Sequence, residues 1–113
     1  MFVEYVANKH TATQLTASNG YPTRGGQQWI VALQSLEGVD FVTFVAHLTQ
    51  SAGTTKIVFQ GALSTDGPWI DLHTFTTVNA SDSTWKQQAK FPLFRLFVES
   101  IGTGLSLTAA VIG

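Results

Sequence analysis

Short runs rich in apolar and β-branched residues alternate along the chain with turn residues, at a spacing of about 8 to 12 residues. The runs with this pattern are 2–7, 11–16, 28–33, 41–48, 56–63, 68–76, 85–89, 93–100 and 105–112. The run at 28–33 also matches a helical stripe and is interpreted as a strand, and the run at 85–89 fits either a strand or a single helical turn. No amphipathic helix, linker or internal repeat competes with it. We therefore predict an all-β antiparallel sandwich of about eight to nine strands, with a jelly roll as its architecture.

The most informative stretch is a hairpin over residues 55–76. An apolar strand at 56–63 leads into a turn at 64–67, where Gly67 tolerates the positive φ that closes such a turn. In the strand that follows, alternation sends Ile70 and Leu72 to the core. The side chains sent outward are Trp69, Asp71 and His73.

Two further strands have clear patterns. Residues 41–48 are nearly all apolar, so we expect both faces of this strand to be covered. In the strand at 93–100, one face carries Phe94, Leu96 and Val98, and the other carries Arg95, Phe97 and Glu99. Phe97 is an aromatic residue between two charged ones, on the face that should be exposed to solvent.

The chain has 113 residues, which fits a single domain over 1–113. Turn residues cluster at 19–26, and this is the longest loop that we expect. Residues 1–26 are therefore interpreted either as part of the sandwich or as an extended N-terminal arm and loop.

Charged residues make up 12% of the chain, against about 25% in an average domain. Threonine, serine, glutamine and glycine take their place. Long charged side chains keep the surface of a monomer hydrated, so a chain poor in them is expected to cover much of its surface with neighbouring subunits. The alternative is a soluble, threonine-rich β domain with neutral polar faces.

The net charge of −1 and the scattered basic residues exclude an electrostatic site for nucleic acid or anionic membranes. No apolar run reaches the roughly 18 to 20 residues of a membrane span. The first residues lack the basic start and apolar block of a signal peptide, and the chain has no cysteine. We expect synthesis in a reducing cytoplasm.

Candidate chemistry is sparse. Asp71 and His73 lie two residues apart beside Trp69, which suggests either a proton-transfer or metal-binding pair or an ordinary solvated strand face. His10 and His47 are isolated, and Asp66 and Asp82 fit turns better than a calcium loop. No catalytic or phosphate-binding motif is present. We expect a non-enzymatic protein without cofactor, metal or small-molecule substrate.

The three tryptophans, Trp29, Trp69 and Trp85, have three interpretations that the sequence leaves open. They can form a sugar-stacking platform, anchor an interface between subunits, or fill the core. The glycan interpretation places a binding patch at Trp69, Asp71 and His73.

Three segments of the chain resemble the small jelly-roll decoration or cement proteins of tailed-phage capsids: 41–45, 61–72 and 94–98. Similar strings occur in discoidin-like and carbohydrate-binding jelly rolls, but the absence of cysteines and of a signal peptide favours a virion protein. The resemblance implies a protein of the capsid surface that binds the major capsid protein and copies of itself, often as a homotrimer, and stabilises the shell.

The function predicted is thus a virion structural protein, with a carbohydrate-binding β-sandwich module as the alternative. Interface residues should be apolar, aromatic or basic where the pattern predicts exposure. The candidates are Phe2, Tyr5, Tyr21, Arg24 and Phe97.

Overall fold

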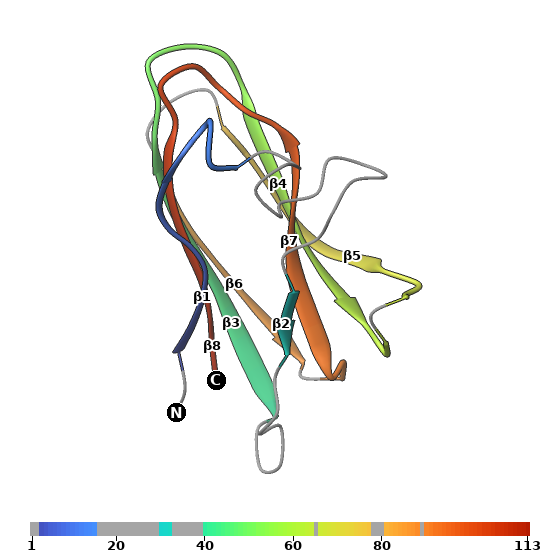
Figure 1. Cartoon of the computed structure of the whole chain (residues 1–113). Helices are drawn as coiled ribbons and strands as arrows, with labels where there is room; N and C mark the ends of the chain where they lie inside the picture. Colours follow the sequence, from blue (N-terminus) through green and yellow to red (C-terminus); the bar gives the residue numbers. More distant parts are fainter. Residues whose placement is uncertain (1–2, 16–29, 33–39, 65, 78–80, 89) are drawn as a thin grey trace.

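The computed structural model describes residues 3–15, 30–32, 40–64, 66–77, 81–88 and 90–113, without the side chains at 4, 30–32 and 81–83. The strands within these ranges are β1 (Val3–Thr11), β2 (Ile30–Ala32), β3 (Phe41–Thr49), β4 (Thr55–Ala62), β5 (Ile70–Thr77), β6 (Ser81–Gln88), β7 (Leu93–Ser100) and β8 (Ser106–Ile112). They form two antiparallel sheets, ordered β1-β8-β3-β6 and β2-β7-β4-β5 (Figure 1). The predicted all-β antiparallel sandwich is confirmed.

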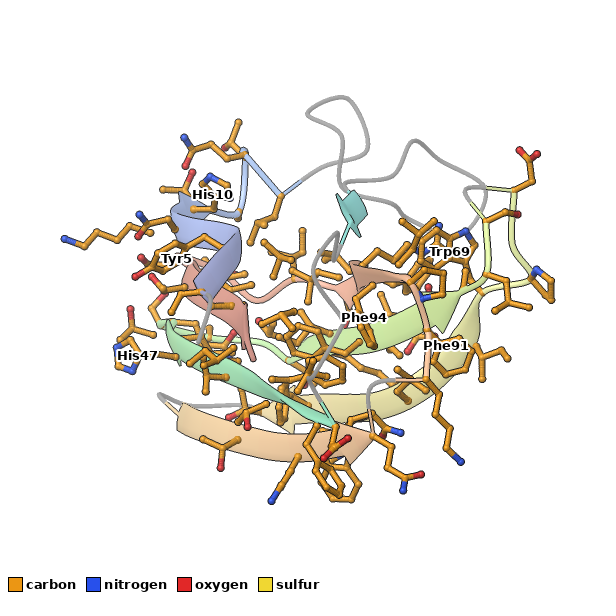
Figure 2. All side chains as sticks on the ribbon, turned by 90° about the horizontal axis from the view of Figure 1, so that it is seen from below. Tyr5, His10, His47, Trp69, Phe91 and Phe94 are labelled. Carbon is orange, nitrogen blue, oxygen red and sulfur yellow. The ribbon has the colours of Figure 1, made fainter. Side chains whose placement is uncertain are left out.

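Aromatic rings from both sheets meet in the core. Phe44 of β3 stacks on Phe59 of β4 with ring centroids 4.4 Å apart, and it meets Phe94 of β7 edge-on at 5.5 Å. All three side chains are fully buried. Each such burial stabilises the fold by about 1.5–3 kcal/mol. Figure 2 shows Phe94 in the middle of this core.

The strand that is covered on both faces is β4 and not β3. Nearly every residue of β4 is buried, whereas β3 alternates between buried residues and exposed or half-buried ones. The prediction for residues 41–48 was therefore wrong for the isolated chain. Both strands lie between two neighbours in their sheets, so the sheet order does not separate them. The difference lies on the outer face, where Val58 and Gln60 of β4 are covered by neighbouring side chains and the outward residues of β3 are not.

The predicted hairpin is confirmed. Strands β4 and β5 pair antiparallel, and the Gly67 N–H donates a hydrogen bond to the Ser64 carbonyl at 3.0 Å. Gly67 has a φ of 88°, as the turn requires, and the Gly67–Pro68 peptide bond is cis. Gly61 of β4 is needed for a different reason: a Cβ there would lie 2.7 Å from the ring of Phe91.

Two segments differ from the prediction. The first strand continues to Thr11, and residues 12–15 form a turn instead of a second strand, with backbone hydrogen bonds from Gln14 and Leu15 to the Thr11 carbonyl. Strand β6 begins at Ser81, before the predicted run at 85–89. Its polar residues pair along the full length of the apolar strand β3, and this pairing outweighs their low strand propensity.

Strand β1 is an edge strand of the first sheet, and its pairing is irregular. Its pairing with β8 shifts register between Tyr5 and Ala7 and again between Ala7 and His10. Lys9 has a φ of 54°, and its backbone N–H donates to the Thr108 hydroxyl at 2.9 Å. Within the proposed arm 1–26, the described residues 3–15 join the sandwich through β1, and Leu15 is buried in the core. The rest of this segment lies outside the described residues.

Candidate interaction surface

The outer side of the β1-β8-β3 part of the first sheet is built from hydroxyl and apolar side chains. Their strand neighbours, such as Phe44 and Val111, point into the core, so these positions point outward. We call this surface the neutral face. Its described members are Val3, Tyr5, Thr43, Val45, Thr108, Ala110 and Ile112.

The register places these residues in rows across the sheet. One row runs from Tyr5 through Ala110 to Val45, and the next runs from Val3 through Ile112 to Thr43. Residues paired in this way have Cβ atoms about 4.5–5.5 Å apart, so each row is a continuous strip. Tyr5 is 54% exposed and points away from the core (Figure 2), whereas Ala110 is 3% exposed. The large ring therefore stands beside a small residue.

Chargeable side chains border the neutral face. His47 is exposed and points outward from β3 (Figure 2), and Asp82 takes the register position opposite it on β6. The Lys86 ammonium lies 4.5 Å from the centre of the Phe41 ring, whose residue is 45% exposed. An exposed cation–π contact of this kind is worth about 0.5–1 kcal/mol. These groups border the neutral face along β6 and at the row that joins Thr108 to His47.

The outer side of β4, β5 and β7 is different, because its polar side chains are joined to one another. Gln60 is 3% exposed; its amide nitrogen donates to Asp71 at 2.5 Å, and its carbonyl oxygen accepts from Arg95 Nε at 2.6 Å. The Lys56 ammonium lies 2.6 Å from the Glu99 carboxylate. We call this surface the networked face. It comprises Lys56, Val58, Gln60, Trp69, Asp71, Arg95, Phe97 and Glu99.

Arg95 lies at the centre of the networked face. Its guanidinium is 4.2 Å from the centre of the Trp69 ring and 5.8 Å from that of Phe97. The Trp69 indole nitrogen is enclosed and has no hydrogen-bond acceptor within the described part of the chain. A sugar-stacking platform needs an open indole face, and Arg95 covers one face of this ring. Glycan binding at Trp69 stays a prediction, and this geometry weighs against it.

The structure separates the predicted patch of Trp69, Asp71 and His73. The β4–β5 register shifts at Phe59 and Gln60: Phe59 pairs with His73, whereas Gln60 pairs with Asp71. This β-bulge turns Asp71 outward and His73 inward, although they are only two residues apart. The predicted outward position of His73 was wrong for this reason. Ile70, predicted in the core, is 47% exposed, whereas Leu72 packs partly against the core.

His73 lies where the second sheet meets the first. Its ring stacks on that of Trp85 from β6, with centroids 4.2 Å apart and planes 5° from parallel, and it meets Phe75 edge-on at 4.6 Å. Desolvation by these rings lowers the pKa of His73 below its usual 6.5. The contact therefore favours a neutral imidazole. The stacked rings of His73 and Trp85 cover the edge of the sandwich between β5 and β6.

The predicted interface residues have different outcomes. Tyr5 is exposed on the neutral face, as expected. Phe97 is on the outer side of β7, as alternation required, but it is 2% exposed, so its prediction as an exposed residue was wrong. It pairs with Val58 and lies near the Arg95 guanidinium, which together shield it. The candidates outside the described residues are Phe2, Tyr21, Arg24 and Trp29.

Sequence reasoning missed the residues that organise both faces, above all Ala110, Val45 and Gln60. Alternation in β8 and β3 separates inward from outward positions, but only the β1-β8-β3 register places Tyr5, Ala110 and Val45 in one row. For Gln60 a signal existed, because a polar residue within a nearly apolar strand predicts a buried hydrogen-bonding role.

Among the described residues, no group of three or more His, Cys, Asp or Glu side chains is placed to hold a metal ion. No helix in the part of the chain that the structure describes is long and apolar enough to cross a membrane. No protein-family model, curated protein sequence or solved structure matches this chain.

Proposed function

We propose that this chain is a non-enzymatic structural protein of a virus particle, which associates with copies of itself and binds the outer surface of a capsid shell. The observation that carries the proposal is the neutral face. Val3 and Tyr5 are 46% and 54% exposed beside threonine, alanine and isoleucine, and Phe41, which is 45% exposed, lies at the border of this face. A surface of this composition suits permanent contact with protein.

The strand order supports the resemblance to capsid decoration proteins. Each strand of the first half pairs with its counterpart in the second: β1 with β8, β2 with β7, β3 with β6 and β4 with β5. We infer that the chain is a jelly roll, in which one long hairpin is wound into two sheets. The major capsid protein is the proposed shell partner, and the trimer that the resemblance implies is a further expectation.

The proposal is tested by locating the protein on particles. Antibodies raised against the purified chain are applied to intact virus particles released by the cells that make the protein, and bound antibody is imaged by electron microscopy. We expect regular labelling of the shell. Particles that carry no label, together with a purified chain that stays monomeric at micromolar concentration, would show that the proposal is wrong.

A further inference from the structure

We infer that the neutral face packs against the same face of a second copy, about a two-fold axis that runs along β8. This inference rests on the self-association in the proposed function and adds its surface and symmetry, and it replaces the trimer that the resemblance implies with a two-fold pair. The axis passes over Ala110, so that Tyr5 of each copy lies on Val45 of the other. Strands of the two sheets then run in nearly the same direction, as in aligned sheet packing.

The relief of the face fits this arrangement. Ala110 is small and 3% exposed, so the two sheets can approach closely at the axis. Tyr5 stands on one side of Ala110, and the half-buried Val45 lies on the other side. The two-fold operation therefore brings each raised ring onto the smaller Val45 of the partner. Tyr5 lies one strand away from the axis, and aromatic residues are enriched among the residues that carry most of the binding energy of a contact.

The charges also permit this pairing. In a two-fold contact, a side chain on the axis meets the same side chain of the other copy. A charged residue near the axis would therefore face a like charge. The row of Ala110 and the row of Ile112 contain hydroxyl and apolar side chains on β1, β8 and β3, whereas the row of Thr108 includes His47 on β3. The two-fold operation places His47 over β1 of the second copy and not over a second His47, and Lys86 lies on β6 outside these three strands. The two copies therefore meet without like-charge repulsion at the axis.

The area is sufficient for a specific contact. The outer side of three strands about 4.8 Å apart and about seven residues long, including the row of His47, covers roughly 340 Å² in projection. The relief of the side chains raises this to on the order of 500 Å² for each copy. The total of roughly 1,000 Å² is at the lower limit for specific interfaces, which predicts a dimer that is best measured at micromolar concentration. The networked face offers no comparable surface, because its charges are joined to one another.

A charge exchange across the axis tests the inference. In the proposed dimer, Tyr5→Lys places an ammonium on Val45 of the partner, and Val45→Glu places a carboxylate under Tyr5. Each substitution alone should weaken the dimer by about a hundredfold or more, since a desolvated charge is left unpaired. The double variant brings the new ammonium of each copy onto the new carboxylate of the other, so two ion pairs form across the axis. It should regain self-association to within about tenfold of the unsubstituted chain.

Analytical ultracentrifugation of the full chain measures all of these species. Thr74→Glu is the matched control, because Thr74 is an exposed strand residue on the outer side of β5. It should leave the association unchanged. If Val45→Glu does not fold by circular dichroism, Val3→Lys with Thr43→Glu repeats the exchange one row along the same axis.

Three outcomes would overturn the inference. An unsubstituted chain that is monomeric at micromolar concentration has no such dimer, and the labelling of particles then decides the proposed function separately. If the single variants associate as strongly as the unsubstituted chain, the contact between copies lies on another surface. Single variants that dissociate, with a double variant that does not recover, show that the neutral face meets a different surface.

Discussion

The two outer faces of the sandwich differ in how their polar and charged side chains are arranged. On the networked face, charges are close and paired: Lys56 with Glu99, and Arg95 with Asp71 through the buried Gln60. On the neutral face, hydroxyl and apolar groups stand in rows, and the charges lie at its border. A face whose polar groups already bind one another has less to gain from a partner than one with exposed rings and methyl groups. Among the described strand residues, the networked face therefore carries more charge than the neutral face.

The largest expected difference between the faces concerns their aromatic residues. Phe97→Ala should destabilise the fold by about 3–5 kcal/mol, because it opens a cavity at a side chain that is 2% exposed. Tyr5→Ala, at a side chain that is 54% exposed, should change stability by less than about 0.5 kcal/mol. Urea unfolding of both variants measures this, and similar losses would show that the two faces are equally part of the core.

A smaller loss of stability is expected for substitution of Gln60, which links Arg95 to Asp71 on the networked face. Gln60→Ala should cost about 1–3 kcal/mol, because Arg95 and Asp71 each lose a hydrogen-bond partner next to a buried site. Gln88→Ala, at an exposed position on β6, is the control and should stay within about 0.5 kcal/mol. Equal stability of the two variants in thermal unfolding would mean that the network contributes little.

The ion pair on the networked face should contribute less again. Lys56 and Glu99 are 43% and 28% exposed, so water and salt screen their attraction. A double-mutant cycle with Lys56→Ala and Glu99→Ala should give a coupling of about 0.2–1 kcal/mol. This coupling should vanish in about 1 M salt. A coupling that persists there would indicate a contact that does not depend on charge.

The smallest expected effect concerns the border between the sheets. The pKa of His73 is lowered in the folded state, so the unfolded chain binds its proton more readily. Its contribution to stability is present above the unfolded pKa of about 6.5 and is lost as pH falls through the folded value. His73→Phe should keep the stacking on Trp85 and reduce the loss of stability as pH falls below about 6.5. Unfolding curves across this range that are parallel for both proteins would contradict the assignment.

Much of the fold followed from local patterns in the sequence. Turn chemistry predicted the β4–β5 hairpin and the positive φ at Gly67, and alternation predicted the core face of β7. These features depend on neighbours along the chain. The errors in β5 and β6 arose where tertiary pairing overrides the local pattern. A bulge beside Leu72 reverses the face of His73, and no residue type marks it in advance.

The candidate surface was less predictable than the fold. Exposure of Tyr5 followed from a short β pattern, but its value as an anchor depends on Ala110 and Val45, which lie far away in sequence. The burial of Phe97 has a similar origin, because the partner that shields it, Val58, lies on another strand. A single sequence shows which side chains alternate along one strand. It does not show which strands become neighbours.

The irregular course of β1 sets a limit on how copies can join. An outermost strand with a regular backbone would offer its unpaired N–H and C=O groups to the strand of another copy, and such growth has no natural end. The register shifts around Ala7 and the left-handed Lys9 interrupt that template. Contact through a flat face about a closed symmetry axis stops at a fixed number of subunits, and the kinked border disfavours open-ended growth through β1.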